Sequence, residues 1–153
     1  MDVYAKMKEM NIVLPKPPGK GGIYTPAMEF CQGLVYVSGC GPCVETPIAG
    51  KLGIDFTVEQ GQEFARSCML NVLSRLQEQI KDLNRVLRAV KILAFVNSAD
   101  DFIQQPLVVN GGSQLLLDLY GEEAGMPARS AIGVNVLPRN IPVEIEVLFE
   151  LKK

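Results

Sequence analysis

A single arginine heads a row of small side chains near the end of the chain. The stretch PARSAIGVNV, residues 127–136, has the alternation of a β-strand. One face carries Arg129, Ala131, Gly133 and Asn135. The other face carries a set that suits a core, namely Ser130, Ile132, Val134 and Val136. Since the small side chains leave space in front of the guanidinium, the pattern fits either a solvated edge charge or a site for an anionic ligand.

Carboxylates recur in the last apolar stretch, residues 143–151. One face of this predicted strand carries Glu144, Glu146 and Glu150. If the stretch pairs with 128–136 as a hairpin, Arg129 and Glu144 lie on the same sheet face, about 20 Å apart. A site that uses both residues then needs strong twist, a different strand pairing or a neighbouring subunit. Periodicity alone favours the alternative, a solvated edge with cross-strand ion pairs.

Histidine is absent from the 153 residues, which narrows the chemistry open to the chain. Its absence excludes Ser-His-Asp and Cys-His catalysis and nearly all familiar catalytic zinc sites. Acid–base steps must then use carboxylates, tyrosine, cysteine, lysine, backbone or water. The net charge is −2 and no lysine–arginine cluster stands out, so a nucleic-acid partner is not expected.

The tetrapeptide CGPC, residues 40–43, has the spelling of the thioredoxin redox motif. That chemistry needs the first cysteine at a helix N-terminus, which lowers the thiol pKa. Residues 44–50 contain a proline and a glycine, make a poor helix start, and offer no second pair of metal ligands. We therefore expect packing in a loop rather than a redox or metal role. The isolated Cys31 and Cys68 are expected to be small core residues.

The elements that must position these residues follow from periodicity and turn signals. A single domain is expected over 1–153, in which residues 1–20 form an N-terminal arm. The expected elements are a helix at 2–10, strands at 23–30 and 34–38, a loop at 39–53, a helix at 58–80, a strand at 86–96, a helix at 105–120, and strands at 128–136 and 143–151. Gly111 and Gly112 are costly within a helix, so either the helix begins after them or a backbone or ligand approaches closely there.

This order predicts an α+β fold, with two helices packed on one face of a mixed sheet. The other sheet face needs a cover, and a homo-oligomer with ligand clefts between subunits would provide it. The start MDVYAKMKEM lacks the pattern of a signal peptide, and no apolar run is long enough to span a bilayer. A cytoplasmic location without a membrane partner is therefore expected.

Three short segments are candidate parts of a ligand site, although each also has an ordinary structural interpretation. Tyr24 stands at a predicted strand start, and Ser38 and Gly39 end a strand where backbone N–H groups could face a ligand. Asn110 precedes the paired glycines, where exposed N–H groups at a helix start would favour an anion. The alternatives are a half-buried tyrosine, a turn and a helix interior.

Together the motifs resemble those of one family, the reactive-intermediate deaminases, also called the YjgF or Rid family. No single motif is specific, but their order and spacing over about residues 20–150 match those of the family. The matching motifs are Gly22-Ile23-Tyr24, Leu34-Val35-Tyr36-Val37-Ser38-Gly39, Asp101-Phe102, Asn110, Pro127-Ala128-Arg129-Ser130-Ala131, Leu137-Pro138 and Val143-Glu144-Ile145-Glu146. The long arm and residues 102–113 indicate a branch distinct from the best-studied members.

The resemblance implies a chorismate-mutase-like α+β fold that assembles as a homotrimer with three clefts between subunits. It implies hydrolysis of reactive 2-imino or 2-enamino acids to a 2-oxo acid and ammonia, without a metal or cofactor. By the same resemblance, Arg129 binds the substrate carboxylate and Glu144 orients or activates water. The residues that line the cleft are Tyr24, Ser38, Gly39 and Asn110.

Two positions depart from the family pattern. Many active members have cysteine where Ala131 stands, and its backbone is the part expected to contact the ligand. The usual Ser-Gly-Gln is Ser38-Gly39-Cys40 here. Three alternatives stay open: a non-catalytic module that binds small carboxylates or acts as a chaperone, an endoribonuclease, and, last, a thiol oxidoreductase.

Overall fold

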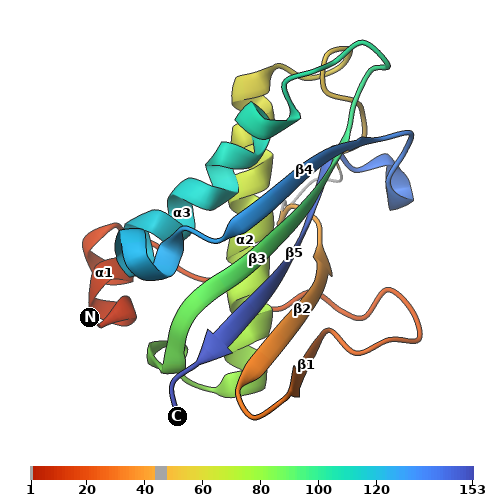
Figure 1. Cartoon of the computed structure of the whole chain (residues 1–153). Coiled ribbons are helices and arrows are strands. Elements are labelled where there is room, and N and C mark those ends of the chain that lie inside the picture. The colour runs from red at the N-terminus through yellow and green to blue at the C-terminus, as the bar shows by residue number, and fades with distance from the viewer. Residues whose placement is uncertain (1, 44–47) are drawn as a thin grey trace.

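The helices and strands follow the order expected from the sequence, with two helices interleaved among five strands. The structure is a computed structural model that describes residues 2–43 and 48–153 (Figure 1). Its elements are α1 (Val3–Glu9), β1 (Ala27–Phe30), β2 (Leu34–Cys40), α2 (Val58–Ile80), β3 (Val86–Asn97), α3 (Gln105–Gly125), β4 (Ala128–Val134) and β5 (Val143–Leu151). The predicted loop at 39–53 is shorter than expected, because β2 continues to Cys40, and part of it lies outside the described residues.

The five strands form one mixed sheet in the order β1-β2-β5-β3-β4. The β3–β4 pair is parallel and the other three pairs are antiparallel. Helices α2 and α3 lie side by side behind this sheet and cover one face (Figure 1). The predicted α+β class, with two helices on one face of a mixed sheet, is confirmed.

The last two strands do not pair as the hairpin considered from the sequence, and the alternative of a different strand pairing is confirmed. β3 lies between β4 and β5, and its Ile92 pairs with Arg129 while its Phe95 pairs with Glu144. The reason is the α3 crossover, which returns the chain to the sheet edge as a strand parallel to β3. The short connection after β4 then carries the chain past β3 instead of turning back on β4.

The predicted faces of β4 are also reversed. Arg129 and Ala131 pair with Ile92 and Ala94, whose side chains are fully buried beneath the helices. The residues expected in the core point the other way, and Ile132 is 45% exposed. On this edge strand, the apolar side chains therefore do not mark the side that faces the hydrophobic core of the chain.

The helices follow their sequence signals closely. Thr57 and Gln60 form the capping box that begins α2, and the apolar stripe of this helix is buried. Gly121 has φ 75° and interrupts α3 at the point where the sequence predicted its end. Gly111 lies inside α3, where a Cβ would be 2.6 Å from the carbonyl carbon of Gln62 on α2. One option from the sequence was that another part of the backbone approaches the paired glycines closely. That backbone is α2, which crosses α3 at this point.

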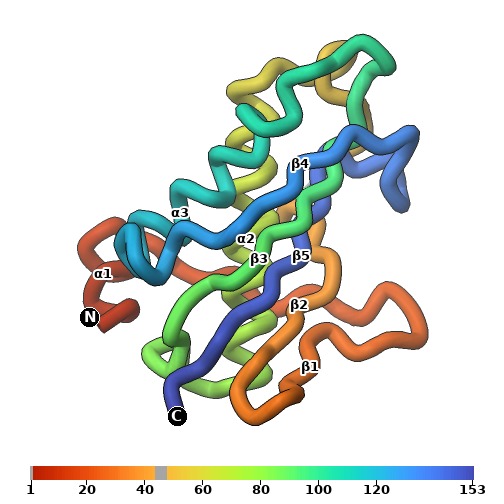
Figure 2. The backbone as a smooth tube through the Cα atoms, in the orientation of Figure 1, coloured from red at the N-terminus to blue at the C-terminus, as the bar shows by residue number. Residues whose placement is uncertain are grey.

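The N-terminal arm is attached to the helix layer. The helix expected at 2–10 is α1, and it buries Val3 and Met7. Beyond it the chain runs across α2 and then projects as an open loop before β1 (Figure 2). The strand expected from residue 23 begins only at Ala27. In the described part of the chain, no helix is both long and apolar enough to cross a bilayer.

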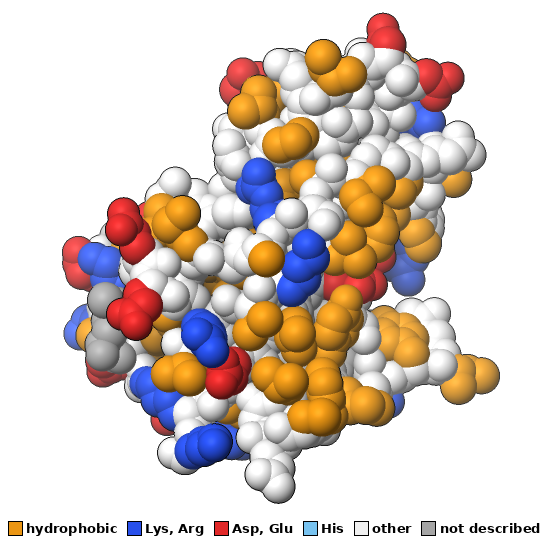
Figure 3. Space-filling model, in the orientation of Figure 1, with side chains coloured by type: hydrophobic (Ala, Val, Ile, Leu, Met, Phe, Trp, Pro, Cys, Tyr) orange, Lys and Arg blue, Asp and Glu red, His pale blue; other side chains and the backbone are white. Residues whose placement is uncertain are grey.

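No part of the chain that the structure describes covers the face of the sheet opposite the helices. Figure 3 views this face, on which apolar side chains gather over the strands. Met28, Phe30, Tyr36 and Ile132 are between 37% and 56% exposed. An apolar sheet face of this kind is typical of a surface that contacts another protein.

Candidate functional site

Arg129 turns toward the helix layer and is held there by α3. Its Nη1 donates to Asn110 Oδ1 at 2.9 Å and to Ser113 Oγ at 3.0 Å, and its Nη2 donates to the Pro106 carbonyl at 3.2 Å. Partial burial lowers the pKa of Arg129 from its ordinary value, yet a guanidinium stays charged at neutral pH. The side chain is therefore a fixed cation, not a mobile edge charge.

The partners of Arg129 orient it without neutralising it. All three acceptors are uncharged, and none of the ion pairs among the described residues involves Arg129. A guanidinium has five N–H donors, of which these bonds use three. The Nε–H and one Nη2–H have no partner within residues 2–43 and 48–153. Two free donors and an unbalanced positive charge suit a carboxylate.

Glu144 lies on the open face of the sheet, against an irregular part of β2. The β2–β5 register shifts between Val37 and Cys40, so that β2 has one residue more than β5 over this interval. This shift brings Gly39 under the Glu144 side chain, and a Cβ at that position would lie 2.7 Å from Glu144 Cδ. Any residue larger than glycine at position 39 would therefore force the Glu144 carboxylate to move.

The Glu144 carboxylate is in an environment that favours its protonated form. Burial, with a smaller contribution from the negative charge of Glu146, raises its pKa above the ordinary value. Its neighbour Glu146 accepts a hydrogen bond from Tyr36 Oη at 2.7 Å. Glu144 itself has no hydrogen-bond partner among the described residues. A partly buried, unpaired carboxyl with a raised pKa can exchange protons with a ligand.

Ser38 ties the Tyr24 segment to β2. The Ser38 hydroxyl donates to the Thr25 carbonyl at 2.8 Å, and the Ser38 N–H donates to the Pro26 carbonyl at 2.9 Å. Tyr24 is 44% exposed in the projecting loop, and its hydroxyl accepts a bond of 3.4 Å from the Gly21 N–H. The predicted residues Tyr24, Ser38, Gly39 and Glu144 thus belong to one region, which we call the glutamate half-site.

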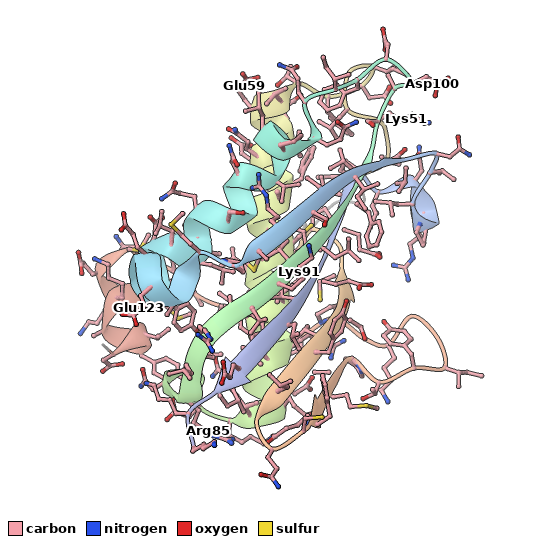
Figure 4. The ribbon with its side chains drawn as sticks, in the orientation of Figure 1. Lys51, Glu59, Arg85, Lys91, Asp100 and Glu123 are labelled. Atoms are coloured by element: carbon pink, nitrogen blue, oxygen red, sulfur yellow. The ribbon has the colours of Figure 1, made fainter. Side chains whose placement is uncertain are left out.

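The remaining predicted residues form a second region, which we call the arginine half-site. It consists of Arg129, Asn110 and Ala131, with Ser113. The register places Arg129 on the helix side of the sheet and Glu144 on the open side. Lys91 of β3, which pairs with Leu148 of β5 and donates to Ser130 Oγ at 2.7 Å, lies near the middle of the sheet on its open side (Figure 4). One copy of the chain therefore does not bring the two half-sites onto one ligand.

The cysteines do not form a reactive pair. Cys40 ends β2 instead of beginning a helix, and burial raises the pKa of its thiol to about 12. The four cysteines are free, and Cys68 is buried as expected. Cys31 was expected in the core but is exposed in the turn after β1, where its φ is 46°. Among the described residues, no group of three acidic, cysteine or histidine side chains is placed to hold a metal ion.

Sequence reasoning missed two groups that position the site. Ser113 follows Asn110 by three residues on α3, so helical spacing alone places both on one face toward Arg129. Tyr36 was noted only as part of a motif, although its alternation with Val35 and Val37 puts it on the face of Glu146. The bond between Tyr36 and Glu146 depends on the β2–β5 register, which the sequence does not give.

Comparison with known proteins identifies relatives along nearly the whole chain. The Endoribonuclease L-PSP family model matches residues 16–150. Protein TCP17 of Trypanosoma cruzi is 40% identical over 152 residues, which cover 97% of this chain and 94% of that protein.

Two solved structures place the fold among known ones. The protein Atu1372 of Agrobacterium tumefaciens, of unknown function, is 32% identical with a TM-score of 0.87, over 99% of this chain and 94% of its own. TdcF of Escherichia coli, crystallised with bound serine, is 23% identical with a TM-score of 0.62, over 90% of this chain and 94% of its own. The TdcF likeness shows a shared fold. On its sequence, its fold and the match over residues 16–150, the chain belongs to the Endoribonuclease L-PSP family, the YjgF family.

Proposed function

We propose that the protein hydrolyses reactive 2-imino and 2-enamino acids to a 2-oxo acid and ammonia. The observation that carries this proposal is Arg129, a cation held by three neutral acceptors with two N–H donors left over. Such a group suits the carboxylate that all these substrates share. TdcF, with its bound serine, gives an example of the same fold holding a small amino acid.

In this mechanism Arg129 anchors the carboxylate and leaves C2 of the substrate facing Glu144. Protonation of the imine nitrogen makes C2 electrophilic, and an enamine reaches the same cation by protonation at C3. Glu144 takes a proton from the attacking water as the C2–O bond forms, which gives a carbinolamine. Return of that proton to nitrogen makes ammonia the leaving group. The C–N bond then breaks as the C2 hydroxyl gives its proton back to Glu144, which leaves the 2-oxo acid and ammonia. The raised pKa of Glu144 suits a group that must both accept and donate.

The other predicted residues have positioning roles in this proposal. Asn110 orients Arg129, and Gly39 leaves space for Glu144. Ser38 and Tyr24 border the cleft, and the backbone at Ala131 lies beside the carboxylate. No step requires a metal or a cofactor, because the protonated imine is already electrophilic. The departure from cysteine at Ala131 leaves these contacts in place.

The cleft is completed by a neighbouring chain in a homotrimer. Arg129 and Glu144 extend from opposite sheet faces, so the arginine half-site of one chain must meet the glutamate half-site of the next. The uncovered apolar face supplies a surface for that contact. Light scattering after gel filtration should therefore give three chain masses.

The direct test couples the protein to a threonine or serine dehydratase, which releases enamine and imine products. Wild-type protein should accelerate 2-oxo acid formation, and Arg129→Ala should not. No acceleration, together with calorimetric binding of 2-oxo acids, would assign the cleft to a binding module instead. RNA cleavage that survives further purification would favour the activity in the family's name, although the chain has no histidine and a net charge of −2.

A further inference from the structure

A cavity of about 430 Å³ lies between the N-terminal arm, the start of β1 and α2. It shares no lining residue with either half-site, although its Pro26 carbonyl accepts the Ser38 N–H bond of the glutamate half-site. Its lining consists of residues 17–20 of the arm, Pro26, Ala27, Arg75, Glu78 and Gln79. The proposed deaminase mechanism gives this cavity no role.

Arg75 is the feature that distinguishes the cavity. It is 7% exposed and is the one buried charged residue in the described part of the chain. Its Nη1 donates to Glu78 Oε2 at 2.8 Å, and the Glu78 side chain is itself 55% exposed. Burial of a guanidinium is costly unless several of its five donors are satisfied. Glu78 is its hydrogen-bond partner within residues 2–43 and 48–153, and no Arg75 nitrogen is both fully buried and unpaired. The remaining donors are therefore accessible to a ligand.

The other buried polar residues on this part of α2 have structural partners. Asn71 donates to the Gly41 carbonyl at 2.9 Å, and Ser74 donates to the Pro15 carbonyl at 2.6 Å. These bonds fasten the loop after β2 and the arm to the helix. Arg75 stands next to them but makes no such bond to the arm. Its position is therefore not explained by the attachment of the arm.

We propose that this cavity binds a compact oxyanion, a carboxylate or phosphate group, between Arg75 and Lys20. Lys20 brings a second positive charge from the arm, and Gln79, which also lines the cavity, has an amide group that can donate to an anion. Glu78 opposes the anion while it holds the guanidinium in place. Because two cations face the anion while one carboxylate repels it, we expect weak binding. The affinity should increase when the Glu78 charge is removed. This site does not depend on the proposed deaminase activity.

The test uses inorganic phosphate and acetate as separate probes, followed through backbone amide shifts of Lys20, Ala27 and Gln79 by NMR. Lys20→Ala should weaken binding roughly threefold, and Glu78→Gln should strengthen it roughly two- to fivefold. Both side chains are exposed, and the amide oxygen in Glu78→Gln can still accept the hydrogen bond from Arg75. Circular dichroism of each variant checks that the fold is preserved. The matched controls are Lys16→Ala on the same arm and Glu63→Gln on the same helix, neither of which lines the cavity. Whichever probe binds more tightly identifies the anion class.

Two further variants separate this site from the arginine half-site. Arg75→Gln should abolish the shifts at the cavity, with a loss of about tenfold or more in affinity. Arg129→Ala should leave them unchanged. Shifts that respond to Arg129→Ala, or that ignore both Lys20→Ala and Glu78→Gln, would overturn the proposal. So would the absence of any shift at the cavity in wild-type protein at millimolar anion.

Discussion

Arg129 and Glu144 extend from opposite faces of one sheet, and β3 separates the strands that carry them. Arg129 is bonded to α3 on the covered face, whereas Glu144 rests on Gly39 on the open face. If both act on one substrate, as we propose, each active site needs two copies of the chain.

Removal of the Arg129 guanidinium should abolish substrate anchoring. We expect Arg129→Ala to lower kcat/KM roughly 10²-fold or more, because two charge-assisted hydrogen bonds are lost. Arg129→Lys should recover little, since an ammonium cannot supply the fork. Arg88→Ala is the matched control, an arginine on β3 that pairs with Glu150. Undiminished turnover by Arg129→Lys would contradict the anchoring role.

Ser113 should matter through Arg129 and not through the substrate directly. Ser113→Ala removes one of the acceptors that fix Nη1 and should lower kcat/KM about threefold to tenfold. Combined with Arg129→Ala, it should have almost no further effect, because both changes act on one interaction. Steady-state kinetics of the two single variants and the double variant measure this coupling. Full additivity would show that Ser113 acts elsewhere.

A methyl group at position 39 should displace Glu144. In Gly39→Ala the new Cβ would lie 2.7 Å from Glu144 Cδ, so the carboxyl must move and activity should fall about tenfold or more. Gly19→Ala is the control, since a Cβ there meets nothing within 4 Å. Circular dichroism should show that both variants fold. Wild-type activity in Gly39→Ala would mean that the present position of Glu144 is not required.

The raised pKa of Glu144 makes a signed prediction about stability. The folded state holds this proton more tightly than the unfolded state, whose pKa is near 4.5. The stabilisation that Glu144 gives by holding its proton is therefore fully present below about pH 4.5. It is lost as the pH rises through the pKa that Glu144 has in the folded state. Glu144→Gln, which imitates the protonated form, should be more stable than wild type at pH 7 but inactive. Thermal melts from pH 4 to pH 8 should show that the difference in Tm between Glu144→Gln and wild type becomes smaller toward pH 4.

Glu146 contributes to that shift and gives a second variant. Glu146→Gln should lower the Glu144 pKa, because it removes the neighbouring negative charge. The acidic limb of the pH–rate profile should then move to lower pH. A profile that does not move would assign the shift to burial alone.

The sequence predicted the elements well because their signals are local. The capping box of α2, the break at Gly121 and the alternation of β5 each depend on neighbouring residues. The placement of β4 depends instead on a crossover through α3, which no local pattern encodes. Ile132 was expected in the core because it is apolar, and Arg129 outside because it is charged. On an uncovered edge strand, both assignments fail.

The sequence predicted only those residues of the candidate site that belong to recognisable motifs. The family resemblance supplied Arg129 and Glu144, and the structure divides them between two faces. The supporting residues Ser113 and Tyr36 come from helix packing and strand register, which appear only in three dimensions. Gly39 was predicted as a cleft residue, and its contact with Glu144 gives a physical reason for glycine there.

The most direct test of the two-chain active site mixes two inactive variants. Arg129→Ala and Glu144→Gln, co-expressed in equal amounts with different tags, should form mixed assemblies in which some clefts receive both an intact arginine and an intact glutamate. If neighbouring chains share each cleft, dehydratase-coupled 2-oxo acid formation should return to about one quarter of the wild-type rate. Mixed assemblies that form but stay inactive would contradict the claim that Arg129 and Glu144 of different chains act on one substrate.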